Sequence, residues 1–358
     1  MKAKKIISNS PLKHIPEDYC PKADIQFFQI KKGFDKGKKI FYRNSKILGN
    51  NPDKCIVFVH GNPECSYTYR NIIKHIITNT KKACQIISMD HIGFGLSDQA
   101  SHEMVCMDHA ENLLQLIRKL DLQNVTLVVH DWGGPIGIGA FLKEPERVSN
   151  LVLLNTTVFP IPITGMTFHN YPISWLGWCY TPFIIPDKFW GDFAAYAIFT
   201  NPRKPITLLS NMVKNIILME FGVFQKPNRI AQSVFKQQFK SKSNVKSSKR
   251  LVMQTKQWGY GNEYQDKILG KRSTKEFYEF IQNNIKSSWG SNGSTVGVKA
   301  ILGRWDPLAQ NEVIKQWTSH LPQLKGNVRI FNKIGHFIEE NKSEAIAEEI
   351  MVLGNLEN

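Results

Sequence analysis

Short apolar runs alternate with amphipathic stretches along the first 158 residues of the chain. Runs of strand length, rich in Val, Ile and Leu, occupy residues 55–59, 85–89, 125–129 and 151–154. Helical periodicity follows them in residues 66–77, 104–120 and 135–142. Two earlier strands within residues 25–42 are expected to pair antiparallel. Strands that alternate with helices indicate a mostly parallel sheet with helices on both faces.

The same alternation returns near the end of the chain, after a long interruption. Strands are expected at residues 296–302 and 328–331, and helices at residues 312–319 and 343–352. The interruption is rich in proline and aromatic residues and has no convincing strand. We therefore predict an α/β fold in which residues 1–158 and 296–358 build a doubly wound sheet. Residues 159–295 are expected to form a helical cap above the carboxyl ends of the strands, where open α/β sheets bind ligands.

Composition places the chain among folded globular proteins, with 42% hydrophobic and 11% aromatic residues. The sequence has neither the apolar core of a signal peptide nor an apolar run of about 18 residues, the length of a membrane span. The six cysteines lack the CxxC spacing of metal and redox motifs, so they are expected to be reduced core thiols. These features predict a cytoplasmic protein without a metal or other cofactor.

The formal net charge of +16 raises nucleic acid or an anionic membrane as a partner. The distribution of this charge argues against specific nucleic-acid recognition. Basic residues are densest in the Lys/Ser tract, residues 240–250. A tract of this composition is most simply a solvated, mobile loop.

Asp131 is the leading candidate for a nucleophile. It follows the apolar run 125–129 and precedes Trp132, Gly133 and Gly134. The glycines permit a tight turn from a strand into a helix, a geometry that lifts a serine above the sheet in the G-x-S-x-G elbow. With Asp in that position, the expected chemistry is alkyl transfer to a carboxylate, which forms an ester on the protein.

Two further residues at strand ends complete a catalytic set. His336 follows the strand at 328–331 and is placed to activate water against an ester on Asp131. Asp306 follows the preceding strand and is placed to hold the imidazole in the required tautomer. The order Asp131, Asp306, His336 matches the nucleophile, acid, histidine order of α/β-hydrolases.

Asn62 and Trp132 supply candidate donors for negative charge. Asn62 follows the strand at 55–59, so its backbone N–H and that of Trp132 are expected to form an oxyanion hole. The Asn62 amide and the Trp132 indole N–H are neutral donors, which suit a weakly solvated anion such as halide. A cationic group would hold halide too tightly for easy release.

Four motifs carry a family resemblance: HGNPECSYTYR at residues 60–70, DHIGFGLSD at 90–98, VHDWGG at 129–134 and GHF at 335–337. Through them the chain resembles haloalkane dehalogenases of the α/β-hydrolase superfamily. The resemblance implies Asp131 as nucleophile, His336 as base, and Trp132 and Asn62 as halide ligands. One subfamily carries a Glu acid where this chain has Asn155, so the acid falls to Asp306.

Other functions on the same fold are also open. The motifs resemble β-lactone decarboxylases of olefin biosynthesis, in which the Asp attacks a ring carbon and carbon dioxide is lost. Epoxide hydrolases generally use cap tyrosines as acids and carry an aromatic residue where this chain has Asn62. A ligand receptor typically lacks the nucleophile or the base, and this chain keeps both. The leading hypothesis is haloalkane hydrolysis with a small hydrophobic substrate and no specific nucleic-acid partner, and the oligomeric state stays open.

Overall fold

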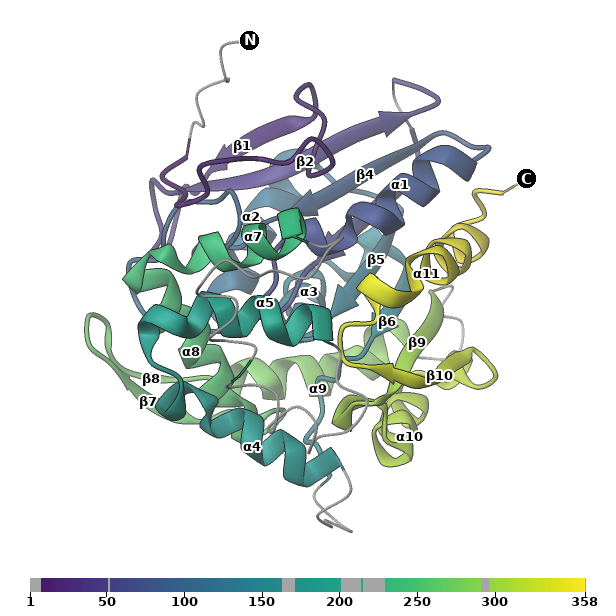
Figure 1. Ribbon diagram of the computed structural model, residues 1–358. Coiled ribbons are helices and arrows are strands. Elements are labelled where there is room, and N and C mark those ends of the chain that lie inside the picture. Colours follow the sequence, from purple (N-terminus) through teal and green to yellow (C-terminus); the bar gives the residue numbers. More distant parts are fainter. Residues whose placement is uncertain are drawn as a thin grey trace.

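The computed structural model describes residues 8–50, 52–162, 171–200, 214, 229–290 and 296–357, which include an eight-stranded sheet (Figure 1). The strands lie in the order β1-β2-β4-β3-β5-β6-β9-β10. Their bounds are β1 (Ile25–Gln29), β2 (Lys39–Ile47), β3 (Cys55–Val59), β4 (Cys84–Met89), β5 (Val125–His130), β6 (Val148–Leu154), β9 (Gly297–Trp305) and β10 (Val328–Gly335). β2 pairs antiparallel with β1 and β4, and the other neighbours pair parallel. The predicted, mostly parallel sheet is confirmed.

The alternation of side chains along the central strands explains why both faces of the sheet are covered. Every residue of β3 and β5 is buried. Val57 and Leu127 belong to one hydrophobic cluster, whereas Ile56, Phe58 and Val128 belong to a second. Because successive side chains of a strand point to opposite faces, these clusters lie on opposite sides of the sheet. The apolar runs of the sequence are therefore strands buried on both faces.

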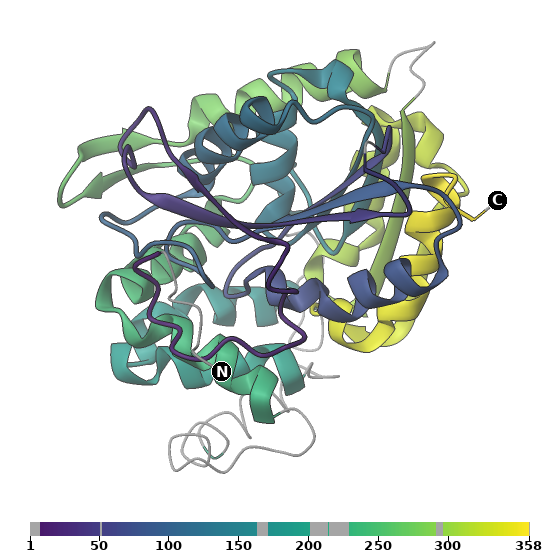
Figure 2. The same cartoon turned by 90° about the horizontal axis from the view of Figure 1, so that it is seen from above.

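Helices lie on both sides of the sheet (Figure 2). α1 and α11 contact each other and contribute Ile72 and Ile350 to the smaller cluster. α2, α3, α9 and α10 contribute to the larger cluster on the opposite face. The bounds of these helices are α1 (Arg70–Asn79), α2 (Cys106–Leu120), α3 (Gly133–Phe141), α9 (Lys275–Trp289), α10 (Asn311–His320) and α11 (Glu339–Leu353).

Within the described part of the insertion, four α-helices precede α9. They are α4 (Tyr171–Ile184), α5 (Trp190–Thr200), α7 (Arg229–Gln237) and α8 (Lys242–Gln254). α5 packs against α7, and α4 packs against α8. Hydrogen bonds from Gln238 to Pro63 and from Ser248 to Asn62 connect this cap to the loop that follows β3. The cap therefore lies over the carboxyl ends of the central strands, whereas α9 packs against α3.

Two expectations for the insertion are wrong. A hairpin of β7 (Glu263–Asp266) and β8 (Gly270–Ser273) lies where no strand is expected. Its strands are four residues each and mostly polar, so the sequence contains no apolar run that would reveal them. The second error concerns the Lys/Ser tract, which is not a solvated loop. Most of it belongs to α8, where Ser247, Ser248 and Lys249 are buried.

Tertiary hydrogen bonds explain why the Lys/Ser tract is ordered. Lys249 Nζ donates to the Ile185 carbonyl at 2.7 Å and pairs with Asp187 at 2.6 Å. Asn244 donates to the Gln238 carbonyl at 2.9 Å and accepts from a backbone N–H at 3.0 Å. Polar side chains of the type common in loops are here satisfied inside the protein.

The cysteines are core thiols, as the sequence predicts. All six cysteines are buried and free of disulfide bonds. Burial raises the pKa of the Cys106 thiol to about 12, so this group stays neutral. In the residues that the structure describes, no helix has the length and apolar character needed to cross a membrane.

Candidate active site

Asp131 lies at a sharp turn between β5 and α3. Its φ angle is 49°, in the left-handed region that few residues other than glycine adopt. Gly133 permits the turn, because a Cβ atom there would lie 2.1 Å from the Val59 carbonyl oxygen. Gly61 permits a second close approach, since its Cβ atom would lie 2.4 Å from Asp131 Cβ. The turn therefore places the carboxylate beside the loop that follows β3.

His336 lies between two carboxylates. Its Nδ1 atom is 2.6 Å from Asp306 Oδ2, and its Nε2 atom is 3.4 Å from Asp131 Oδ1. The side chains of Asp131 and Asp306 are 7% and 3% exposed, and that of His336 is 25% exposed. The structure thus brings the three predicted residues together, with the imidazole in the middle. This is the geometry that a base and its orienting acid require.

The charges favour an ion pair in the free site. Burial raises the pKa of Asp131, but the hydrogen bond and charge of His336 outweigh it and bring that pKa below its ordinary value. Burial lowers the pKa of His336, but the charge of Asp306 and the hydrogen bond with Asp131 raise it to about 10. At neutral pH Asp131 is therefore a carboxylate, the nucleophilic form, and His336 is an imidazolium.

Asn155 holds Asp306 in place, a role that the sequence alone does not reveal. Its Nδ2 atom donates to Asp306 Oδ2 at 2.6 Å and to the Gly303 carbonyl at 3.1 Å. Its Oδ1 atom accepts from the Gly303 N–H at 2.8 Å. The Leu308 N–H donates to the other Asp306 oxygen at 3.1 Å. The position of Asn155 directly after β6, at the end of a central strand, was the available signal.

Asn62 lies beside Asp131, in the loop that follows β3. Its backbone N–H donates to Asp131 Oδ2 at 2.8 Å. Its side-chain Oδ1 accepts from the Ser248 hydroxyl at 2.5 Å. The Nδ2 atom is buried and has no hydrogen-bond partner among the residues described. A buried amide donor without an acceptor is costly, so a ligand atom that accepts from Nδ2 would be stabilised here.

Trp132 is held by an aromatic neighbour from the cap. Its side chain is 2% exposed, and its ring centroid lies 4.1 Å from that of Trp258. The Trp258 indole N–H donates to the Thr157 carbonyl at 2.7 Å, which fixes the second ring. Trp258 lies in the proline- and aromatic-rich insertion, where the sequence contains no motif that would distinguish it from the other aromatic residues.

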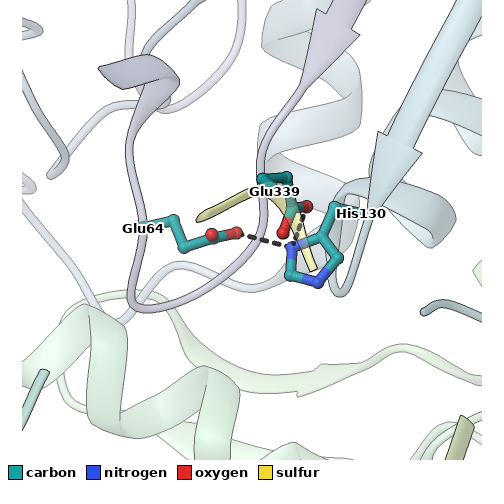
Figure 3. A group of neighbouring side chains, drawn as sticks. All are labelled: Glu64, His130 and Glu339. Carbon is teal, nitrogen blue, oxygen red and sulfur yellow. Dashed lines mark hydrogen bonds and ion pairs between the residues drawn. The ribbon is translucent and has the colours of Figure 1, made fainter. Parts of the chain in front are cut away.

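Glu64, His130 and Glu339 form a buried cluster beneath these residues, and both carboxylates point to the same imidazole nitrogen (Figure 3). His130 Nδ1 lies 2.7 Å from Glu64 and 2.9 Å from Glu339. His130 Nε2 lies 3.0 Å from the backbone carbonyl of His336. The cluster therefore connects the loop after β3, the end of β5 and the start of α11, which all lie next to candidate site residues. Each member lies within three positions of Asn62, Asp131 or His336, which was the sequence signal for it.

The groups around His130 favour its protonated form. The His336 carbonyl can only accept, so His130 Nε2 carries a hydrogen atom. Burial lowers the pKa of His130, but the charges of Glu339 and Glu64 outweigh it and hold that pKa well above its ordinary value. These three side chains could also hold a metal ion, but a tetrahedral Zn²⁺ keeps its ligand atoms about 3.4 Å apart. The observed separations of 2.7 and 2.9 Å are those of an imidazolium paired with two carboxyl groups, one of which accepts its hydrogen bond.

The sequence matches a known protein family, and the fold is similar to that of solved structures. A family described as alpha/beta hydrolase fold matches residues 54–342. A haloalkane dehalogenase structure from Paraglaciecola agarilytica gives a TM-score of 0.59 at 18% identity, over 94% of this chain and 96% of that chain. A mutant haloalkane dehalogenase from Agrobacterium tumefaciens gives 0.61 at 16% identity, over 95% and 100%. At these identities the structural likeness concerns the fold.

Two relatives match shorter stretches at higher identity. A cis-3-alkyl-4-alkyloxetan-2-one decarboxylase from Shewanella oneidensis is 39% identical over 132 residues, which are 36% of this chain and 39% of the relative. A haloalkane dehalogenase from Mycolicibacterium paratuberculosis is 36% identical over 102 residues, 28% of this chain and 33% of the relative. The matches thus span well under half of each relative. The family match covers most of the chain and agrees with the sheet and the cap, so the chain belongs to the α/β-hydrolase fold family.

Proposed function

We propose that this protein hydrolyses haloalkanes to alcohols through an ester on Asp131. The observation that carries the proposal is the Asn62 amide, a buried Nδ2 donor without a hydrogen-bond partner in the described structure. Its backbone N–H contacts the nucleophile, so this donor lies next to the reacting carboxylate. Trp132, the next residue after Asp131, supplies a second neutral donor.

In the first step, an Asp131 oxygen attacks the carbon that bears the halogen. The new C–O bond forms as the carbon–halogen bond breaks, and the halide leaves with the bonding electrons. The Asn62 amide and the Trp132 indole N–H stabilise this anion as its charge develops. Neutral donors also let the halide leave after the reaction.

In the second step, His336 changes its role because Asp131 loses its charge. Burial opposes the imidazolium, and the hydrogen bond with charged Asp131 is one of the contacts that raise its pKa. Once Asp131 is an ester, that pKa falls and His336 releases a proton. The neutral imidazole then takes a proton from water, which attacks the ester carbonyl. The intermediate expels the alcohol and restores the Asp131 carboxylate, with one proton released overall.

A second candidate is β-lactone decarboxylation, which the 39% identical stretch shared with the Shewanella decarboxylase favours. Asp131 would attack the saturated ring carbon that is bonded to the ring oxygen. That C–O bond would open to give a carboxylate. Loss of carbon dioxide would then form an alkene and expel Asp131 unchanged. This reaction uses the same nucleophile but releases no halide.

Parallel assays of both substrate classes distinguish these candidates. The protein is incubated with a panel of bromoalkanes and, separately, with a cis-dialkyl β-lactone. Bromide release that is abolished in Asp131→Asn supports the proposal. Alkene formation without bromide release favours the decarboxylase. If neither product forms at any chain length, both functions are wrong.

A further inference from the structure

The Lys/Ser tract places one serine against the candidate halide donor. Ser248, on α8, donates its hydroxyl hydrogen to Asn62 Oδ1 at 2.5 Å. The Trp190 indole N–H, from α5, donates to Ser248 Oγ at 2.9 Å. Trp190 and Ser248 are fully buried. Two cap helices therefore meet the loop after β3 through a continuous chain of hydrogen bonds.

The donor and acceptor properties of these groups set the direction of both hydrogen bonds. An indole N–H only donates, so the Ser248 oxygen accepts from Trp190 and its own hydrogen is free to go to Asn62. A side-chain amide has one accepting end and one donating end. With Oδ1 engaged by the hydroxyl, the accepting end faces the cap and Nδ2 remains available.

We propose that Ser248 is a positioning residue that keeps the donating end of the Asn62 amide available to the leaving anion. This inference rests on the proposed function. Without the hydroxyl, the amide can turn over and present an oxygen, which repels a halide. The cap thereby affects leaving-group binding through α8, in addition to enclosing the substrate.

The test compares bromide affinity in variants of neighbouring serines. Ser248→Ala removes the hydrogen bond, and Ser248→Cys keeps a similar volume with only a weak donor. Ser247→Ala is the matched control, because Ser247 is equally buried on the same helix and has no hydrogen-bond partner in the described residues. Bromide binding is measured by tryptophan fluorescence, and kcat and KM are measured with a bromoalkane.

We expect both Ser248 variants to weaken bromide binding by about twofold to tenfold, the worth of one hydrogen bond. Their kcat/KM for the bromoalkane falls in parallel. Ser248→Ala also leaves the buried Trp190 indole N–H without its acceptor, so its melting temperature should lie below that of Ser247→Ala. If wild type binds bromide and the Ser248 variants bind it equally well, the positioning role is refuted. Equal weakening by Ser247→Ala refutes it too. If wild type neither binds nor releases bromide, the proposed function itself is wrong, and this inference falls with it.

Discussion

Replacement of Glu339 by Gln should stabilise the protein at alkaline pH. Glu339 is fully buried, and its two oxygens accept no hydrogen bond within the described residues, although Oε1 lies 2.9 Å from His130. Burial raises the pKa of Glu339 to about 7, against the lowering effect of the His130 charge. Glutamine has the shape of the protonated acid and removes the charge that burial disfavours.

The magnitude follows from proton linkage. The unfolded chain loses this proton near the ordinary value of 4.5, and the folded chain loses it near pH 7. Between these values the folded state binds more protons, so wild-type stability falls as pH rises. Each pH unit is worth about 1.4 kcal/mol, so the interval costs roughly 3 kcal/mol by the time Glu339 is fully ionised. Glu339→Gln does not have this cost because glutamine does not ionise.

Urea unfolding of wild type and variant at about pH 5 and about pH 8 measures the difference. The two proteins should be close in stability at the lower pH, and the variant should be more stable by roughly 3 kcal/mol at the higher pH. Glu340→Gln is the matched control. It removes the Glu340 charge and one of the two oxygens that accept from Arg70, at 2.6 and 2.7 Å, and should destabilise the protein because the buried guanidinium loses its paired charge. If the free energy of unfolding changes equally with pH in wild type and Glu339→Gln, the raised pKa assigned to Glu339 is refuted.

Two further predictions concern the reacting groups. Asp306→Asn removes the charge that stabilises the imidazolium formed when His336 takes a proton from water. Ester hydrolysis should therefore slow by at least about a hundredfold. Rapid-quench measurement of that step tests this, and an unchanged rate would exclude Asp306 as the orienting acid. Trp132→Phe keeps the aromatic packing against Trp258 but loses the indole N–H, so bromide affinity should fall at least about tenfold. Fluorescence of the remaining tryptophans reports the affinity, and an undiminished value would exclude the indole as a donor.

The sequence predicts the sheet well because its central strands are buried on both faces. Such strands must be apolar throughout, as residues 55–59 and 125–129 are. Asp131 follows a strand of this kind, and Asp306 and His336 follow the parallel strands β9 and β10. Parallel strands bring their carboxyl ends to one edge. Their proximity could therefore be expected from topology, without any knowledge of side-chain contacts.

The cap is harder to predict because its order depends on contacts distant in sequence. The composition of residues 240–250 is equally compatible with a loop. The tract becomes helical and buried through contacts such as Ser248 with Asn62, which is 186 positions away. The hairpin of β7 and β8 is short and polar, so it has no hydrophobic periodicity. Pairing of Glu64 and Glu339 around His130 likewise depends on contacts between segments that are far apart in sequence.

Mass spectrometry of a His336→Phe variant tests the central claim most directly. Without the base, water is not activated, so the ester formed by a bromoalkane should accumulate on Asp131. We predict that the peptide containing Asp131 gains the mass of the alkyl group less one hydrogen. Asp131→Asn combined with His336→Phe should show no gain. An unmodified Asp131 in a His336→Phe protein that has released bromide, or an alkyl group on another residue, would contradict the proposed mechanism.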